Sequence, residues 1–268
     1  MDIDSKIILR TGNPMPIFGL GTWKLDKDTV ATVSKALLLG YPMIDTSGDY
    51  GTQPAVGEGI RNSRIPRRMI YVVTKVEEDE DSFQATIKNL KELQLDYVDL
   101  MLIHRPPESS AGIDLWRGLI QVKNEGLAKD IGVSNYSIDQ IEELIASTSE
   151  VPVVNQIEWS PFGHRPEMLE YCQDKNIALQ AYSPLTRAER LDDDTLRDIA
   201  MQYDKTPAQI LARWNIQLGT VPIIKANKIE HLEEDMDIFD FEISADDMAT
   251  LNSLNEEYSA LGPSLQYV

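Results

Sequence analysis

The chain has 268 residues, of which 42% are hydrophobic and 26% are charged, so it has the composition of an ordinary globular protein with a sizeable core. Its formal net charge of −19 at pH 7 argues against nucleic acid or an anionic membrane as a partner, and no apolar run approaches the ~20 residues of a membrane span. The single cysteine, Cys172, and an N-terminus that lacks the apolar core of a secretion signal predict a cytoplasmic protein with no disulfide and no metal site.

Short β-branched runs alternate with amphipathic helical stretches along the whole chain. An N-terminal hairpin-like segment over residues 6–23 comes first, and a helix is expected at Asp28–Leu39, where Val30, Val33 and Leu37 share one face. The pattern then predicts, in order, strand 41–45, helix 54–62, strand 69–74, helix 82–93, strand 98–103, helix 113–124, strand 130–133, helix 138–146, strand 153–157, helix 166–174, strand 178–181, helix 194–203, strand 221–224 and helix 229–235.

This alternation amounts to eight strand–helix units without a Gly/Ser/Pro-rich linker, so we expect an α/β protein with one domain over residues 1–268. A parallel, eight-stranded (β/α)8 TIM barrel with an N-terminal β-hairpin fits this pattern best. The rival is an open doubly wound sheet, which usually has a glycine-rich turn and a helix after its first strand. Gly19 and Gly21 lack the third glycine and the following helix, which favours the barrel.

Four polar residues, Asp45, Tyr50, Lys75 and His104, lie just past the ends of three consecutive strand-like runs. Parallel strands bring their C-terminal ends to one rim, so these side chains are expected to meet there. Tyrosine has a reference pKa near 10, which is too high for an efficient acid at neutral pH unless a cation stabilises the phenolate. Lys75 is the candidate cation, Asp45 would orient it, and His104 would bind a substrate oxygen or share the proton. The alternative, a buried ion pair and a core histidine, explains each residue alone better than all four together.

Polar residues also end or follow the next three strands. These are Ser134 with Asn135, then Gln156, then Tyr182 with Ser183. Amides and an aromatic ring on one rim suit a flat heteroaromatic group that bears a carboxamide, which is compatible with a nicotinamide dinucleotide.

Charged residues mark two further features. Lys225 follows the last strand and precedes a helix start, so a cation and a helix N-terminus together predict a local anion site. The acidic runs Glu77–Asp81 and Asp192–Asp194 are most simply solvated loops or helix starts.

Several stretches together resemble the aldo-keto reductases over about residues 7–255. The short loops are similar to those of the prokaryotic 2,5-diketogluconate reductase type. The matching stretches are GLGTW (19–23), IDTSGDYG (44–51), VVTKV (72–76), LDYVDLMLIHRP (95–106), GLAKDIGVSNY (126–136), VNQIEWSP (154–161), AYSPL (181–185), TPAQILARW (206–214) and FDFEIS (239–244).

The resemblance implies a (β/α)8 barrel that binds NADPH across its C-terminal mouth and transfers a hydride to an aldehyde or ketone. It implies that Tyr50 is the proton donor, that Lys75 and Asp45 tune its acidity, and that His104 orients the carbonyl. The implied substrate residues are Trp23, Tyr50, His104 and Arg105, and the implied cofactor residues are Gly21, Thr22, Asp45, Ser134, Asn135, Gln156, Tyr182, Ser183, Leu185, Lys225, His231 and Asp235.

Three departures from the family pattern stand near the catalytic residues. Thr52-Gln53 replace the usual Asn-Glu, which we interpret as a structural change. Arg105 replaces a common tryptophan after the histidine, and it would either draw in an anionic substrate or cap the loop. An acidic stretch, Val76–Asp81, replaces a loop that usually bears tryptophan and predicts a more open, less apolar site.

The site for the 2′-phosphate of NADPH departs further. The family pattern has serine and arginine where this chain has Ala226 and His231, and asparagine where it has Asp235. An arginine–phosphate contact contributes about 1.5–3 kcal/mol per hydrogen bond. We therefore expect NADP(H) to be the cofactor but to bind weakly, or NADPH and NADH both to be used.

Two other functions compete with a reductase. One is a catalytically impaired barrel of this family that keeps a nucleotide-binding or structural role, which the altered phosphate site favours slightly. The other is a Schiff-base aldolase that uses Lys75. The expected partner is a small-molecule aldehyde or ketone, and we expect a monomer.

Overall fold

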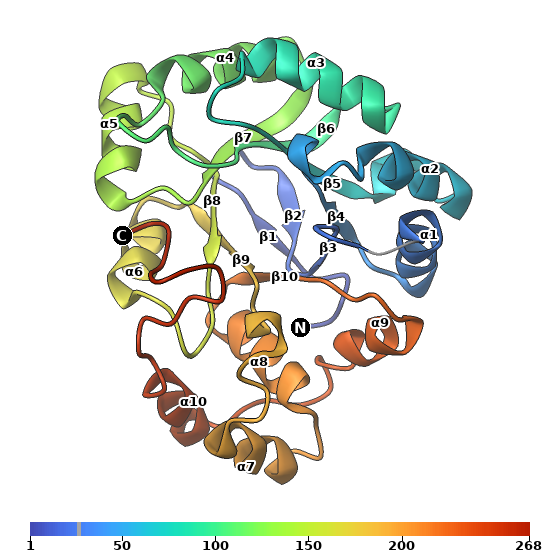
Figure 1. Ribbon diagram of the computed structural model, residues 1–268, viewed down its shortest axis with the longest axis vertical. Coiled ribbons are helices and arrows are strands. Elements are labelled where there is room, and N and C mark those ends of the chain that lie inside the picture. Colours follow the sequence, from blue (N-terminus) through green and yellow to red (C-terminus); the bar gives the residue numbers. More distant parts are fainter. Residues whose placement is uncertain (26–27) are drawn as a thin grey trace.

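The computed structural model describes residues 1–25 and 28–268, and in it eight parallel strands close into a barrel surrounded by helices (Figure 1). The strand order around the barrel is β10-β3-β4-β5-β6-β7-β8-β9, and a separate two-stranded antiparallel sheet pairs β1 with β2. The predicted TIM barrel with an N-terminal hairpin is therefore confirmed. The strands are β1 (Lys6–Ile8), β2 (Pro14–Pro16), β3 (Gly19–Gly21), β4 (Met43–Asp45), β5 (Tyr71–Val76), β6 (Val98–Ile103), β7 (Ala128–Ser134), β8 (Val154–Glu158), β9 (Ala178–Tyr182) and β10 (Val221–Ile224).

Helices follow the barrel strands and cover their outer faces (Figure 1). Three short 3-10 helices, η1 (Gly48–Tyr50), η2 (Arg67–Met69) and η3 (Thr186–Ala188), lie in the loops. The α-helices are α1 (Thr29–Leu39), α2 (Gln53–Ser63), α3 (Ser82–Leu93), α4 (Ile113–Asn124), α5 (Ile138–Thr148), α6 (Pro166–Asp174), α7 (Asp194–Gln202), α8 (Pro207–Gln217), α9 (Ile229–Met236) and α10 (Ala245–Asn252).

Most predicted elements agree with these bounds to within two residues, and the differences have local causes. The strand expected at 69–74 starts two residues later, because Arg67–Met69 form η2. The first barrel strand, β3, lies inside the segment assigned to the hairpin. Its three residues include two glycines and carry almost no strand propensity of their own, so the pairing of Leu20 with strands on both sides establishes it.

Two helices, α8 and α10, were missed by the sequence pattern. Every residue of α8 from Gln209 to Ile216 is buried, so this helix has no polar face to create a 3.6-residue period. Its start nevertheless carries a clear local signal. Thr206 and Gln209 form a capping box, and Pro207 occupies the first turn.

The hairpin closes the N-terminal end of the barrel, behind the barrel opening in Figure 1. Thr11 and Asn13, in its turn, donate hydrogen bonds to the two carboxylate oxygens of Asp130 in β7, at 2.7 and 3.0 Å. Met15 of β2 packs into the barrel interior. The opposite end, where the strands finish, is left for a site.

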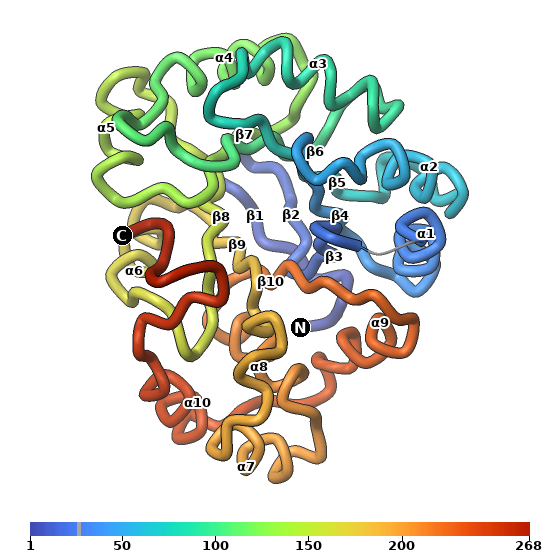
Figure 2. The backbone as a smooth tube through the Cα atoms, viewed as in Figure 1, coloured from blue at the N-terminus to red at the C-terminus, as the bar shows by residue number. Residues whose placement is uncertain are grey.

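The segment after α10 returns across the C-terminal end of the barrel, beside α6 and β8 (Figure 2). Glu158, the last residue of β8, accepts hydrogen bonds from Ser259 Oγ and Ala260 N at 2.6 and 2.7 Å. Gly163 allows the close approach, because a Cβ there would lie 1.8 Å from the carbonyl oxygen of Tyr258. The returning segment thereby becomes one wall of the barrel mouth.

Candidate active site

Side-chain alternation along the strands directs the predicted catalytic residues into the barrel mouth. Along β5, Tyr71 and Val73 point into the barrel interior, and Lys75 continues that series. Met43 and Leu102 point inward in the same way, so Asp45 and His104, two residues later, do so as well. The register aligns these strands, since Asp45 pairs with Val73 of β5. Three of the four residues therefore converge because of strand geometry alone.

Asp45 and Lys75 form a buried ion pair beneath the mouth. Lys75 Nζ donates hydrogen bonds to Asp45 Oδ1 and Oδ2 at 2.7 and 2.9 Å and to the carbonyl oxygen of Thr46 at 2.9 Å. The Lys75 side chain is 1% exposed and the Asp45 side chain is 5% exposed. Gln156 Nε2 adds a hydrogen bond to Asp45 Oδ2 at 2.8 Å. The carboxylate is fully engaged, and the lysine is held in one orientation.

Tyr50 comes from η1, directly after β4. Its ring centre lies 5.2 Å from Lys75 Nζ and 5.7 Å from the ring centre of His104, with an edge-on geometry of 72°. Burial raises the pKa of Tyr50 well above its ordinary value. Asp45, Asp49 and Glu77 raise that pKa further, and Arg105 lowers it. Tyr50 is thus a protonated phenol at neutral pH.

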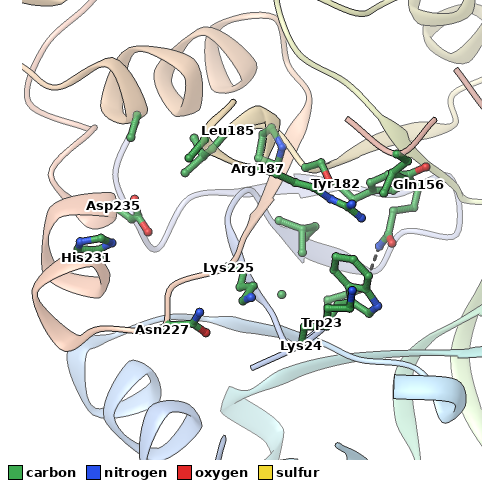
Figure 3. A pocket seen from close by; sticks show the side chains of 18 of the residues that line it. Trp23, Lys24, Gln156, Tyr182, Leu185, Arg187, Lys225, Asn227, His231 and Asp235 are labelled. Atoms are coloured by element: carbon green, nitrogen blue, oxygen red, sulfur yellow. Dashed lines mark hydrogen bonds between the residues drawn. The ribbon is translucent and has the colours of Figure 1, made fainter. Parts of the chain in front are cut away.

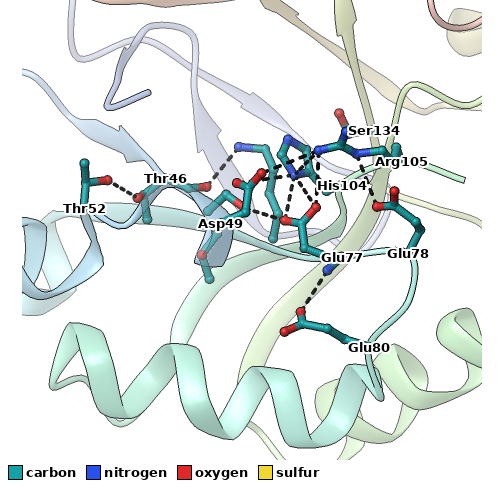
Figure 4. A network of polar contacts seen from close by, with 12 residues as sticks. Thr46, Asp49, Thr52, Glu77, Glu78, Glu80, His104, Arg105 and Ser134 are labelled. Atoms are coloured by element: carbon teal, nitrogen blue, oxygen red, sulfur yellow. Dashed lines mark hydrogen bonds and ion pairs between the residues drawn. The ribbon is translucent and has the colours of Figure 1, made fainter. Parts of the chain in front are cut away.

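His104 is hydrogen-bonded to a carboxylate that the sequence pattern did not single out (Figure 4). His104 Nδ1 lies 2.7 and 2.9 Å from the two carboxylate oxygens of Glu77. The prediction that Glu77–Asp81 is a solvated loop or helix start is wrong for Glu77, whose side chain is only 15% exposed. It is correct for Asp81, which caps the N-terminus of α3.

Arg105 is surrounded by carboxylates. Its guanidinium lies 3.6 Å from Asp49, 3.4 Å from Glu77 and 3.3 Å from Glu78. We considered two roles for Arg105, to attract an anionic substrate or to cap the loop, and these contacts agree with the second. Asp49, Glu77 and His104 each offer a potential metal ligand within 4.8 Å of one another, but Arg105 contacts both carboxylates and offsets part of their negative charge.

The residues expected to bind a carboxamide contact one another on the far side of the mouth. Ser134 Oγ donates a hydrogen bond to the main-chain carbonyl oxygen of Gln156 at 2.7 Å, and Asn135 Nδ2 donates one to Ser134 Oγ at 3.1 Å. Tyr182 OH donates to Asn135 Oδ1 at 2.7 Å. Asn135 Nδ2 also donates to the carbonyl oxygen of His104 at 3.0 Å, which joins this group to the catalytic side.

A cavity of about 1110 Å³ connects these groups and extends toward α9 (Figure 3). Lys75 is buried beneath the cavity and Thr22 does not line it. Thr22 Oγ1 is buried without a hydrogen-bond partner in the described part of the chain. The predicted site residues that line the cavity are Gly21, Trp23, Asp45, Tyr50, His104, Arg105, Ser134, Asn135, Gln156, Tyr182, Ser183, Leu185, Lys225, His231 and Asp235.

The polar or charged cavity residues that the sequence reasoning missed include Lys24, Arg187, Asn227 and Lys228. Lys24 Nζ and Arg187 Cζ each lie 4.3 Å from the ring centre of Trp23. Lys228 precedes α9 as its N-cap, next to the expected anion site. Lys24, Arg187 and Lys228 therefore add positive charge to the cavity lining, although the protein as a whole is strongly acidic.

The α9 end of the cavity also carries Asp235, which is only 4% exposed. Burial raises the pKa of Asp235 from 3.8 to about 7, and the nearby charge of Glu234 contributes to the increase. This carboxyl group is therefore about half protonated near neutral pH. Any anion bound beside Lys225 and His231 favours the protonated form further.

The replacement at Thr52-Gln53 has the structural role that we expected. Gln53 begins α2 and is fully buried. Its side-chain amide donates to Asn89 and Glu92, each at 2.9 Å, and its carbonyl accepts a hydrogen bond from Thr74 Oγ1 at 2.7 Å. Gln53 thus ties α2 to β5 and α3.

Comparison with known proteins places this site in a family. A family model described as the Aldo/keto reductase family matches residues 18–256. The chain belongs to the aldo/keto reductase family. It is 40% identical over 256 residues to an aldo-keto reductase of Mycolicibacterium vanbaalenii, covering 93% of this chain and 92% of that protein. It is 38% identical over 261 residues to a glyoxal reductase of Bacillus subtilis, and the match covers 95% of this chain and 94% of that protein.

Solved aldo/keto reductase structures share the fold. One from Brucella melitensis superposes with a TM-score of 0.88 at 38% identity and covers 93% of this chain and 99% of that one. A Bombyx mori aldo-keto reductase in complex with NADP superposes with a TM-score of 0.90 at 32% identity. The match covers 97% of this chain and 95% of that one. Membership of this family makes the protein an oxidoreductase. In the described residues, no helix has the length and apolarity that crossing a membrane requires.

Proposed function

We propose that the chain is an NAD(P)H-dependent carbonyl reductase in which Tyr50 donates a proton to the oxygen of an aldehyde or ketone. The observation that carries this proposal is the position of Tyr50 on the cavity wall, with its ring 5.2 Å from Lys75 Nζ and 5.7 Å from the His104 ring. The same cavity is lined by the amides and the aromatic ring that suit a nicotinamide.

The chemistry needs an acid next to the reacting carbonyl. The nicotinamide, when bound, supplies the hydride for the carbonyl carbon, and the oxygen then takes up a proton. Tyr50 holds that proton because its pKa is raised, first by burial. Once the proton has left, the phenolate is stabilised by the Lys75 cation, which hydrogen bonds to Asp45 hold in place. His104 positions the carbonyl oxygen of the substrate between its own ring and the ring of Tyr50.

The cofactor would lie along the cavity from the amide groups to α9. Ser134, Asn135 and Gln156 would hold the carboxamide and Tyr182 would stack on the ring. Lys225 and His231 would meet the adenosine phosphate, with Gly21, Ser183 and Leu185 along the channel. His231 offers less than an arginine to a 2′-phosphate, which supports weak NADPH binding or use of both NADPH and NADH.

The substrate proposed is a small, uncharged aldehyde or ketone. Arg105 is already paired with three carboxylates, so the rim around it has an excess of negative charge. A carboxylate substrate would be repelled there. The name of the Bacillus subtilis relative, glyoxal reductase, is compatible with such a substrate.

The test is Tyr50→Phe. We expect turnover with NADPH and a small aldehyde to fall by at least about 10²-fold, while cofactor binding, followed by fluorescence titration, stays within about threefold. Tyr97→Phe, a tyrosine stacked under Arg67 away from the cavity, is the matched control and should keep full turnover. Equal turnover of Tyr50→Phe and the wild type would refute the proposal.

The two alternatives make different predictions. An impaired barrel would bind NADPH and reduce no member of a panel of aldehydes, ketoacids and diketones. A Schiff-base aldolase would be trapped on Lys75 by borohydride in the presence of substrate. Lys75 is 1% exposed and bound to Asp45, which disfavours its attack on a carbonyl.

A further inference from the structure

Glu77 is a partly buried carboxylate at the barrel mouth that contacts three side chains. It follows β5, two residues after Lys75, and its Oε1 accepts a hydrogen bond from Ser47 Oγ at 3.0 Å. Both of its oxygens lie within 2.9 Å of His104 Nδ1. Arg105 approaches Oε2 at 3.4 Å. Nothing in the function proposed above uses this residue.

The contacts of Glu77 determine where the proton of His104 sits. Burial raises the pKa of Glu77, but the hydrogen bond and charge of His104, the hydrogen bond from Ser47 and the charge of Arg105 outweigh it, so the net pKa is below the ordinary value. Glu77 is therefore ionised at neutral pH and has no proton to donate. The hydrogen between it and the ring must belong to Nδ1, and Nε2 is the nitrogen left for a ligand.

The surroundings of His104 determine how easily the ring becomes charged. Besides Glu77, Asp49 Oδ1 lies 3.8 Å from Nδ1. Arg105 contributes one positive charge at 3.4 Å, and the Tyr50 ring is neutral. The ring therefore faces two carboxylates and one guanidinium. Only the imidazolium form has a hydrogen on Nε2 while Nδ1 stays bonded to Glu77.

We propose that Glu77 is a positioning residue for His104. Its carboxylate keeps a hydrogen on Nδ1 and, together with Asp49, stabilises the imidazolium, so that Nε2–H can donate a hydrogen bond to a carbonyl oxygen. A neutral ring held by Glu77 would present Nε2 as an acceptor and would not bind that oxygen. The last step rests on the proposed function, whereas the pairing of Glu77 with His104 does not.

The first experiment is NMR of the uniformly ¹⁵N-labelled full-length protein. The chain has only three histidines, so His104 is assigned by comparison with His164→Gln and His231→Gln. In the wild type we expect long-range ¹H–¹⁵N spectra to place a hydrogen on Nδ1 of His104 at every pH. In Glu77→Gln the titration of the His104 signals should move to lower pH, because the charge is lost while an acceptor remains.

The second experiment is the pH dependence of kcat/KM for reduction of a small aldehyde. The ratio of wild type to Glu77→Gln should be near one at pH 5.5 and rise to about tenfold at pH 8.5, since the variant loses its imidazolium at lower pH. Glu78→Gln is the matched control: it removes the same charge from the next residue, which pairs with Arg105 Nε and does not contact His104. Its pH profile should follow that of the wild type.

Three results would overturn the proposal. They are a neutral His104 with its hydrogen on Nε2 in the wild type, identical titration of His104 in the wild type and Glu77→Gln, and a rate loss in Glu77→Gln that is the same at every pH. Even if Glu77→Gln does not fold, the wild-type spectrum still tests the proposal, because it shows which ring nitrogen of His104 carries the hydrogen. The spectra need no turnover, so a protein with the expected spectra and no reductase activity would refute the proposed function alone.

Discussion

Lys75 Nζ donates a hydrogen bond to each carboxylate oxygen of Asp45, at 2.7 and 2.9 Å, where both side chains are almost completely buried. Removal of one partner of such a pair lowers the free energy of unfolding, because the other charge is left in a medium that solvates it poorly. The same pair sits beneath Tyr50, and its lysine stabilises the Tyr50 phenolate in the proposed mechanism. Stability and turnover can therefore be separated by removing one charge or both.

Lys75→Met should lower the free energy of unfolding by about 3–5 kcal/mol, because Asp45 is left buried without its counter-charge. The double variant Asp45→Asn/Lys75→Met should recover most of that loss, since neither charge remains and Asn still offers Gln156 an acceptor. Both variants should lose turnover. Urea unfolding and aldehyde reduction measure the two effects separately.

The control for this cycle is Lys35→Met on the surface. Lys35 lies 4.0 Å from Glu233, and the two side chains are 40% and 57% exposed. Its loss should cost less than about 1 kcal/mol. A double variant with restored turnover would contradict the role given to the pair.

Strand alternation made much of the site predictable from the sequence. Asp45, Lys75 and His104 each come two residues after an inward-facing apolar residue, so a barrel necessarily brings them together. The same reasoning accounts for Gln156, two residues after the inward-facing Val154. What such a pattern supplies is the direction of a side chain on a regular strand.

Loops lack that regularity, and there the prediction failed. Glu77 is the first of a run of acidic residues, and only the path of the chain after β5 shows that it turns back to His104. Arg187 lies in a turn where Thr186, Arg187 and Ala188 all have φ between 51° and 69°. No glycine marks that left-handed turn, so the sequence offered no signal for it.

His231→Arg should tighten NADPH binding by about tenfold or more and leave NADH binding within about twofold. A guanidinium can form a bidentate, charge-assisted contact with the 2′-phosphate that imidazole cannot, and NADH has no such phosphate. Fluorescence titration with both cofactors measures the ratio. Leu38→Arg, which adds a cation on α1 away from the cavity, should change neither affinity. Sub-micromolar NADPH affinity with strong discrimination against NADH in the wild type would contradict the expected dual use.

Ionic strength should distinguish the two roles considered for Arg105. Three carboxylates surround this one guanidinium, so an anionic ketoacid should be repelled at low salt. Between 10 and 150 mM salt, kcat/KM for a ketoacid should rise by about threefold at saturating cofactor, because the Debye length shortens from ~30 to ~8 Å. A neutral aldehyde of the same length serves as the control and should show no change. A fall for the ketoacid would mean that Arg105 attracts anionic substrates.

Asp235 predicts a pH dependence of stability with a defined sign. Its pKa in the folded protein is about 7, against 3.8 as the ordinary value, so between these two values the folded state binds more protons than the unfolded state. The free energy of unfolding therefore falls as the pH rises through this window. A difference of about three pH units corresponds to roughly 4 kcal/mol at most.

Asp235→Asn removes this ionisable group while keeping its size, so the variant should be more stable than the wild type by an amount that grows from pH 4 to pH 7. Above pH 7 the gain should level off near 4 kcal/mol or below, because Asp235 is then ionised in both states of the wild type. Urea unfolding at four pH values measures it. Glu233→Gln, an exposed substitution on the same helix, should show no such trend. A gain that stays constant with pH would mean that Asp235 affects stability through packing rather than through its charge.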